Sequence, residues 1–331
     1  MNLSTTYLGF KLPHPIIPGA SPLTGDLAPV RRLVEAGAPM IIMHSIFQEQ
    51  IEREQVAFHR GMERAENSSA ESLSYLPKPD EFRLGPDEYL ERLAQIKDAV
   101  KVPVVASLNG HTSGGWIEYA RLLAKAGADA LELNLYETLV DIKRDAASVE
   151  NEAVTIVTEV CRAVDIPVAV KLSPNYTCLG HFARRLDGAG AKGVVLFNRF
   201  YQPDIDVENL EAVPTLELST SRDLLPRLRA VAALYGNCTA DLAITGGVHT
   251  ALDVLKSVMV GASAVQIVSA LLRHGPFHLR TIREDLSRWL QAHEYDSLAK
   301  AKGSMSLEKT PNPAAFERGN YAKILQSWSA E

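Results

Sequence analysis

The sequence predicts an α/β protein in which one chain of 331 residues forms a single (β/α)8 TIM barrel. Short apolar runs alternate with amphipathic stretches about eight times, in units of roughly 30 residues. Small residues recur where the amphipathic stretches end, as in Ala36-Gly37-Ala38 and Ala126-Gly127-Ala128. No GxGxxG motif follows the first apolar run, which disfavours an open dinucleotide-binding sheet. A closed parallel barrel is therefore the predicted fold.

Composition excludes several classes of protein. With 46% hydrophobic and 22% charged residues, the chain can build a full core, and its formal charge of -6 gives no footprint for nucleic acid. We expect no secretory signal at Met1–Thr6 and no apolar run long enough for a membrane span. The three cysteines, which are far apart, favour reduced thiols in a cytoplasmic protein over a metal or iron–sulfur site.

The first two predicted strands are residues 15–20, which follow a short hairpin, and residues 40–44. A helix is expected between them at residues 27–35, where apolar residues recur with helical spacing. Residues 46–86 are then long, polar and charged. A connection of this length is more often a functional insertion or lid than a plain linker.

From residue 86 the alternation becomes regular. Between the sixth strand and its helix we expect an irregular stretch that contains Pro203 and Pro214. A helix to about His293 and a last helical stretch at 321–328 belong to a C-terminal extension (286–331), which could close the barrel floor or dock on a neighbouring subunit. The predicted strands are 102–108, 130–135, 168–172, 193–197, 242–244 and 264–268, and the helices are 87–100, 115–126, 148–164, 179–188 and 223–234.

The loops after the seventh and eighth predicted strands resemble a common phosphate site of such barrels. Gly246 and Gly247 allow a close backbone approach and positive φ angles. Thr250 and Ser269 can each cap the helix that follows, so that free N–H groups point at an anion. Two ordinary strand–turn–helix junctions would give the same local pattern.

Site residues of this architecture lie at the carboxyl ends of the strands. An asparagine there offers both a donor and an acceptor, which suits the amide edge of a planar heterocycle. Lys171 closes an apolar strand and needs an anionic partner: a reduced flavin, a substrate carboxylate or the carbonyl of a Schiff base. The strand-end residues are Ser21, His44, Asn109, Asn134, Lys171, Asn198 and the Gly246–Gly247 pair.

Four motifs resemble the dihydroorotate dehydrogenase family, whose members are FMN-binding (β/α)8 barrels: residues 131–135, 171–175, 245–248 and 261–266. The resemblance implies that Ala20 and Ser21 contact the flavin ring and that Asn109 and Asn134 meet its polar edge or ribityl chain. It implies that Lys171 stabilises reduced FMN and that Asn198 faces flavin or substrate. The residues implied near the phosphate are Ser219, Thr220, Gly246, Gly247, Val268 and Ser269.

The substrate half of the family pattern is different here. The family has a cysteine or serine base shortly after the strand-four asparagine, whereas this chain has Glu137 at that place by direct count. The asparagine-rich orotate loop is missing, with residues 79–85 near its position, and the His44 region replaces a lysine after strand two. Glu137, Tyr136 and His44 are the candidates for the proton-transferring group.

These observations predict an FMN-dependent oxidoreductase that acts on a CH–CH bond of a small planar substrate. By resemblance the nominal reaction is dihydroorotate to orotate, a step of pyrimidine biosynthesis. One alternative is a lyase or aldolase that uses Lys171 as a Schiff-base nucleophile. Another is a flavin-binding protein without turnover of dihydroorotate. Electrons would leave to a diffusible acceptor or through a partner protein, and the family resemblance implies a homodimer.

Overall fold

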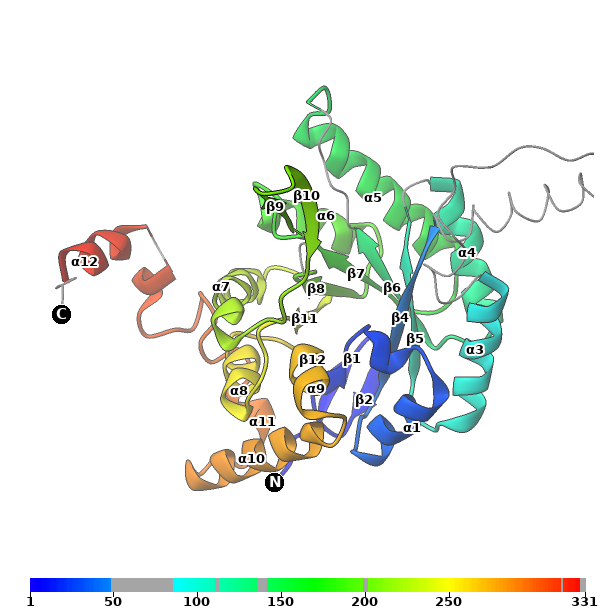
Figure 1. Ribbon diagram of the computed structural model, residues 1–331. Coiled ribbons are helices and arrows are strands. Elements are labelled where there is room, and N and C mark those ends of the chain that lie inside the picture. Colours follow the sequence, from blue (N-terminus) through cyan, green and yellow to red (C-terminus); the bar gives the residue numbers. More distant parts are fainter. Residues whose placement is uncertain (49–85, 111–112, 136–141, 199–201, 317, 328–331) are drawn as a thin grey trace, which may run out of the picture.

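A ring of helices surrounds an inner ring of parallel strands (Figure 1). The computed structural model describes residues 1–48, 86–110, 113–135, 142–198, 202–316 and 318–327. Its first half contains β1 (Thr5–Tyr7), β2 (Phe10–Leu12), β3 (Ile16–Pro18), η1 (Pro22–Thr24), α1 (Leu27–Glu35), β4 (Ile41–Phe47), α3 (Pro86–Ala99), β5 (Val104–Asn109), α4 (Ser113–Lys125), β6 (Ala130–Leu135) and α5 (Ala146–Ala163).

The second half continues the alternation of strand and helix and then leaves the barrel. It contains β7 (Val168–Leu172), α6 (Leu179–Gly188), β8 (Gly193–Leu196), β9 (Gln202–Asp206), β10 (Glu211–Thr215), η3 (Ser221–Leu224), α7 (Leu225–Leu234), β11 (Asp241–Thr245), α8 (Ala251–Met259), β12 (Ala264–Ile267), α9 (Ser269–His274), α10 (His278–Ala292), α11 (Leu298–Ala301), η4 (Pro313–Phe316) and α12 (Gly319–Ser327).

Eight parallel strands form one sheet in the order β3-β12-β11-β8-β7-β6-β5-β4. The two end strands, β3 and β4, approach each other and so nearly close the sheet into a barrel. The registers bring Asn109 beside Asn134 and Asn134 beside Lys171. The predicted (β/α)8 barrel is confirmed, and three predicted strand-end side chains lie on consecutive strands.

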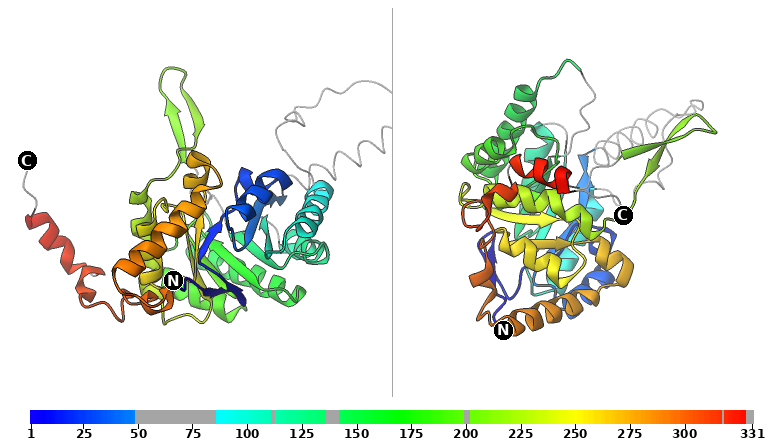
Figure 2. Two further views of the ribbon diagram at one scale, coloured as in Figure 1. Left: turned by 90° about the horizontal axis from the view of Figure 1, so that it is seen from below. Right: turned by 90° about the vertical axis from the view of Figure 1, so that its left-hand side faces the viewer.

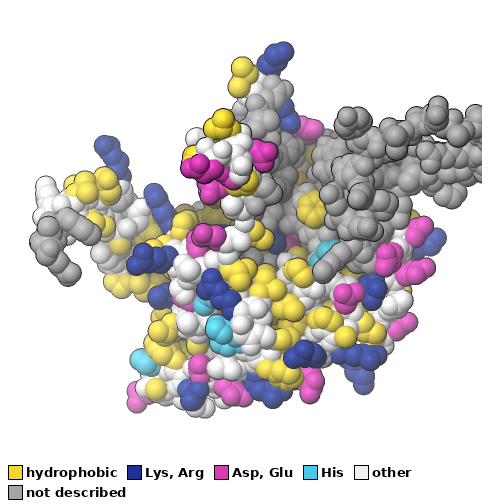
Figure 3. All heavy atoms as spheres, in the orientation of Figure 1, with side chains coloured by type: hydrophobic (Ala, Val, Ile, Leu, Met, Phe, Trp, Pro, Cys, Tyr) yellow, Lys and Arg dark blue, Asp and Glu magenta, His cyan; other side chains and the backbone are white. Residues whose placement is uncertain are grey.

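The stretch around Pro203 and Pro214 is a β-hairpin, which corrects the predicted irregular loop. Strands β9 and β10 pair antiparallel, with Pro203 directly opposite Pro214. A residue whose backbone nitrogen faces outward in a two-stranded ribbon makes no hydrogen bond to the other strand. Proline, which lacks the N–H, is therefore tolerated at such a position. The hairpin stands away from the barrel (Figure 2), and acidic and apolar side chains gather on it (Figure 3).

The N-terminal hairpin β1–β2, rather than the C-terminal extension, closes the barrel floor. Tyr7, Leu8 and Leu12 pack against the inward-facing residues at the lower end of the strands. Asp241 of β11 holds the hairpin by accepting a hydrogen bond from the Leu8 backbone N–H at 2.8 Å. The extension instead runs beside α7 and α8 before α12, which lies apart from the barrel (Figures 1 and 2).

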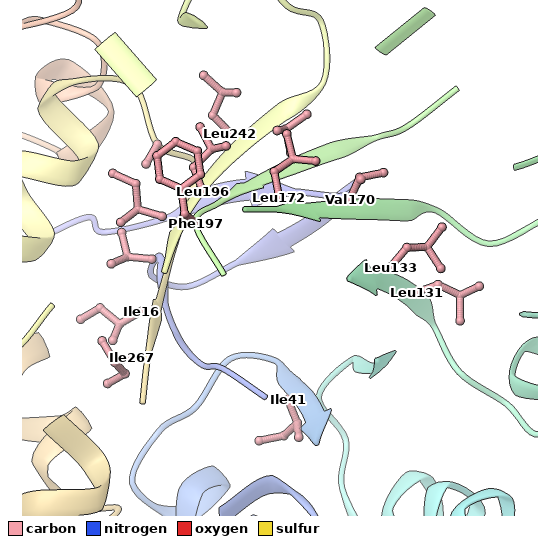
Figure 4. Packing of buried hydrophobic residues seen from close by; sticks show 14 of the residues in the cluster. Ile16, Ile41, Leu131, Leu133, Val170, Leu172, Leu196, Phe197, Leu242 and Ile267 are labelled. Atoms are coloured by element: carbon pink, nitrogen blue, oxygen red, sulfur yellow. The ribbon is translucent and has the colours of Figure 1, made fainter. Parts of the chain in front are cut away.

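Alternate residues of each strand face the helix layer and build the main core. Figure 4 shows such side chains around the barrel, among them Leu131, Leu133 and Val170, all of which are buried. The intervening residues face the barrel interior, as the period of two in a β-strand requires. On β6 these are Ala130, Glu132 and Asn134, so polar side chains enter the interior of the barrel.

A bulge in β4 changes which polar residue of that strand faces the interior. The pairing of β4 with β5 shifts between Ile42 and Ser45. Ser45 consequently reaches the interior, where its Oγ lies 2.8 Å from the Ser107 Oγ. His44 turns toward the helix layer, where its ring centroid lies 5.6 Å from that of Tyr89. A β-bulge redirects a side chain in this way.

The buried His14 gives the fold a dependence on pH. Its Nδ1 accepts a hydrogen bond from the Ile16 N–H, so its Nε2 donates to the Gly37 carbonyl. Burial lowers the pKa of His14 to about 4, against the effect of the Gly37 hydrogen bond, and the nearby Arg283 lowers it further. The native state therefore holds His14 neutral at pH values where the unfolded chain binds a proton.

We expect the free energy of unfolding to fall as the pH drops from about 6.5 to about 4. The unfolded state binds more protons in that window, and the shift of His14 corresponds to about 3 kcal/mol. Urea unfolding at a series of pH values measures the effect. His14→Gln should flatten the curve in this window, and exposed His181 provides the control substitution His181→Gln. Parallel curves for His14→Gln and the unmodified protein would contradict the assignment.

Candidate functional site

A buried ion pair lies in the middle of the barrel. The Lys171 Nζ of β7 lies 3.1 Å from the Glu132 Oε1 of β6. The other carboxylate oxygen, Oε2, accepts a hydrogen bond of 2.6 Å from the Gln266 Nε2 of β12. Glu132 and Gln266 have no exposed surface, and Lys171 is 7% exposed. Because charges in an apolar interior are costly unless paired, this group holds its members in fixed positions.

A second polar cluster occupies the neighbouring strands. The Asn134 Nδ2 donates to the Ser45 Oγ and the Ser107 Oγ, both at 3.0 Å. Its third and longest contact is the Leu108 carbonyl at 3.4 Å. The two serines and the strand-end amide thus fix the orientation of Asn134. Asn109, next to it on β5, is also buried.

A cavity of about 290 Å3 extends from the ion pair toward the loops after β8, β11 and β12. That volume is at the lower end of the range for small-molecule pockets. Lys171 and Gln266 line one part, and Gly246 and Gly247 line another. Its further walls are Ala20, Ser21, Pro22, Phe197, Asn198, Leu216, Leu218, Ser219, Asp223, Arg227, Thr245, Val248, Val268, Ser269 and Leu272.

The glycine pair after β11 forms a cradle with two serines. Gly246 and Gly247 have φ angles of +84° and +79°. The Gly247 N–H donates to the Ser219 Oγ at 3.3 Å, and the Ser219 N–H donates to the Ser269 Oγ at 3.2 Å. The hydroxyls of Ser219 and Ser269 lie 3.0 Å apart. Backbone N–H groups and hydroxyls around a turn of positive φ are suited to an anion.

The start of α8 contributes less to this cradle than the sequence predicts. Thr250 is the N-cap as expected, but the Asp253 Oδ2 accepts hydrogen bonds from the backbone N–H groups of both His249 and Thr250 at 3.0 Å. Those N–H groups are therefore used within the loop. Ser269 is the first residue of α9, not its cap, which is Val268. The Gly247 and Ser219 N–H groups are likewise bonded to serine hydroxyls, so the hydroxyls of Ser219 and Ser269 beside the glycine turn remain as the main anion-binding groups.

Two cationic or titratable side chains near the cradle were not predicted from the sequence. Arg227 of α7 lines the cavity and donates to the Thr245 carbonyl next to the glycine pair. His249 Nε2 lies 3.3 Å from the Ser219 Oγ. Burial, followed by Arg273, lowers the pKa of His249. Arg227 lies within a predicted helix and His249 within a predicted loop, so nothing in the sequence pattern marks either residue as functional.

Glu132 and Gln266 were also missed, although the sequence carried a signal for each. Each is a polar residue flanked on both sides by apolar residues in a short strand, as in Leu131-Glu132-Leu133 and Val265-Gln266-Ile267. On a strand buried on both faces, such a residue must point into the barrel or the helix layer and needs a partner. Strands β6 and β12 are not neighbours in the sheet, so that partner was not evident from the sequence.

The structure brings most of the predicted binding residues together. Nine of them line the cavity: Ala20, Ser21, Lys171, Asn198, Ser219, Gly246, Gly247, Val268 and Ser269. Asn134 lies beside Lys171 on the next strand and Asn109 beside Asn134. Thr220 is exposed and bonds Asp223 in the cap of η3. Glu137 and Tyr136 lie outside the described residues.

His44 lies outside the group that lines the cavity. Its Nδ1 is buried without a hydrogen-bond partner, and a side chain at Gly25 would approach this atom to 3.4 Å. Burial lowers the pKa of His44, while Asp26 opposes that shift. The ring is therefore held neutral near pH 7 between η1 and α3. Within the described chain no His, Cys, Asp and Glu residues are grouped so as to hold a metal ion.

Comparison with known proteins identifies the family. The family model described as dihydroorotate dehydrogenase matches residues 83–290, well over half of the chain. The chain belongs to the dihydroorotate dehydrogenase family. The matched region includes β5 to β12, which carry Glu132, Lys171 and the glycine cradle.

Individual relatives extend the match along the chain. A protein of Aeropyrum pernix, assigned by name to dihydroorotate dehydrogenase A (fumarate), is 32% identical over 65% of this chain and 72% of its own. The dihydroorotate dehydrogenase B (NAD(+)) catalytic subunit of Thermoplasma acidophilum is 25% identical over 91% of this chain and 98% of its own. A chloroplastic dihydropyrimidine dehydrogenase (NADP(+)) of Arabidopsis thaliana is 20% identical over 91% and 76%.

We expect Gly247→Ala to destabilise the protein and to disrupt the cradle. The added Cβ would lie 2.3 Å from the Leu224 backbone nitrogen, in addition to the strain of the +79° φ angle. Gly127→Ala is the matched control, because Gly127 also has positive φ but no atom within 4 Å of an added Cβ. Strain alone costs about 1–2 kcal/mol, and the clash should bring Gly247→Ala to about 3 kcal/mol or more. Equal destabilisation in urea unfolding would contradict the close packing of this turn.

Proposed function

We propose that this protein is an FMN-dependent oxidoreductase that acts on a CH–CH bond of a small planar substrate, with dihydroorotate as the nominal substrate. The main support for this proposal is a single cavity that has a buried lysine and an amide at one end and the anion cradle at the other. Membership of the dihydroorotate dehydrogenase family supports a dehydrogenase role.

The residues present fit FMN. The Gln266 Oε1 is buried and has no hydrogen-bond partner, so the cavity offers an unused acceptor to a ring N–H. Lys171 offers an ammonium suited to the N1–C2=O edge of a flavin, where negative charge develops on reduction. The Ser219, Gly247 and Ser269 cradle suits the phosphate, with Arg227 nearby. The proposed cofactor thus has a counterpart for each of its polar ends.

The residues of the chain would bind, orient and protect the reacting groups. Bound FMN would supply the hydride chemistry. Lys171, held by Glu132, would fix the ring edge, and Phe197, Ala20 and Ser21 would line the ring and exclude water. We propose Glu137 as the base that removes the substrate proton, with Tyr136 as the other candidate, because the His44 ring lies in the helix layer beside Tyr89 rather than in the cavity. Electrons would then leave to a diffusible acceptor or a partner protein.

The lyase alternative is disfavoured by the ion pair. As an ammonium bound to Glu132 at 3.1 Å, Lys171 has no lone pair with which to attack a carbonyl. Incubation with a keto acid and borohydride should therefore leave Lys171 unmodified by mass spectrometry. An adduct on Lys171 in a protein without flavin would favour the lyase.

The first test is a visible absorption spectrum of the purified protein, recorded anaerobically before and after addition of dihydroorotate. We expect a flavin band that bleaches. Glu137→Gln should slow the bleaching by the factor of about 100 to 10,000 that a general base contributes, while the band and the FMN affinity are retained. A flavin band that does not bleach would remove dihydroorotate as the substrate. No flavin after incubation with FMN would overturn the proposal.

No helix in the described ranges is both long and apolar enough to cross a membrane.

A homodimer remains the expected assembly, and a cytoplasmic location remains the expectation from cysteine usage. Analytical ultracentrifugation would measure the assembly directly.

A further inference from the structure

We propose that Glu132, itself held by Gln266, is a positioning residue that fixes Lys171 and balances its charge, so that it lowers the reduction potential of the bound flavin. The inference rests on the proposed function and deepens it. It concerns the buried triad defined by Lys171, Glu132 and Gln266.

Among the described side chains, those of Lys171 and Gln266 hydrogen-bond to Glu132. One carboxylate oxygen meets Lys171 at 3.1 Å and the other meets Gln266 at 2.6 Å. Below the triad the barrel interior is largely apolar, with four buried alanines on the strands among larger side chains such as Ile17, Met40 and Val105. The carboxylate is therefore held from two sides and cannot turn toward water.

The direction of each hydrogen bond is fixed by chemistry. A carboxylate only accepts, so Gln266 must present its NH2 group to Glu132. The Gln266 Oε1 consequently faces away from Glu132 and is the partnerless acceptor at the cavity. Glu132 thus determines the orientation of two groups that line the cavity: the ammonium of Lys171 and the carbonyl of Gln266.

The charge balance has a consequence for the flavin. A lone buried ammonium would favour the negative charge that the flavin acquires on reduction, since interactions between charges are strong in a low-dielectric interior. Here the Glu132 carboxylate already offsets the Lys171 charge at 3.1 Å. Reduced flavin would have to share the ammonium with this carboxylate. Glu132 therefore opposes reduction, while it keeps Lys171 in place.

The test compares the two-electron reduction potential of bound FMN in the unmodified protein and in Glu132→Gln. The substitution removes the charge and keeps the shape. Gln266 can rotate its amide so that the unpaired Oε1 accepts from the introduced NH2 group. We expect the equilibrium to shift toward reduced flavin by about tenfold or more, which is about 30 mV for a two-electron couple. A purely structural role would change FMN affinity but not the potential.

Two further variants complete the design. Glu132→Asp keeps the carboxylate but shortens its reach, so we expect a smaller shift in the same direction, and this variant decides the question if Glu132→Gln does not fold. Glu150→Gln is the control, because Glu150 pairs with Arg185 between α5 and α6, outside the barrel. It should leave the potential unchanged.

The outcomes separate the inference from the proposed function. A flavin that binds with the same potential in all folded variants would overturn the role of Glu132 and leave the FMN proposal intact. A shift toward oxidised flavin in Glu132→Gln would also overturn it. Failure of the unmodified protein to bind FMN would overturn both.

Discussion

The ion pair between Glu132 and Lys171 is the constraint on which the interior of this barrel depends. Two opposite charges lie on neighbouring strands inside a ring of apolar residues, and each is tolerable only because the other is present. Removing one partner of such a pair costs about 3–5 kcal/mol. The register of β6 against β7 cannot slip by one residue without turning one charge toward the helix layer. The pair thus links the alignment of the strands to the chemistry of the cavity.

The anion cradle follows a different physical logic, because backbone geometry rather than side-chain charge builds it. Gly247 packs against the backbone of η3 so closely that a Cβ would collide with Leu224. This approach brings Ser219 to the Gly247 N–H, and Ser269 to Ser219. Asp253 meanwhile uses the N–H groups at the start of α8. The loop is therefore hydrogen-bonded to α8 on one side and lines the cavity on the other.

The sequence predicted the barrel well because burial on both faces leaves a clear apolar signal. The bounds predicted for α1, α6, β6 and β7 agree with the structure. Most binding residues could be placed because strand ends converge at one edge of a barrel. The hairpin β9–β10 was missed because proline is typical of loops and because these exposed strands lack the run of buried apolar residues that marks the barrel strands. The partners of Lys171 were missed because Gln266 reaches Glu132 across the barrel rather than along a neighbouring strand.

The hairpin β9–β10 presents two open strand edges to solvent, which is ordinarily a hazard for aggregation. Its exposed Ile205, Val207 and Leu210 would add to that hazard. Two features counter it: a proline on each strand and an excess of acidic residues, with no Lys or Arg between residues 202 and 217. If two such ribbons met edge to edge, their acidic side chains would repel each other. The prolines would also leave backbone carbonyls of the other ribbon without an N–H donor. The same prolines that hid this element in the sequence therefore protect it from joining a copy of itself.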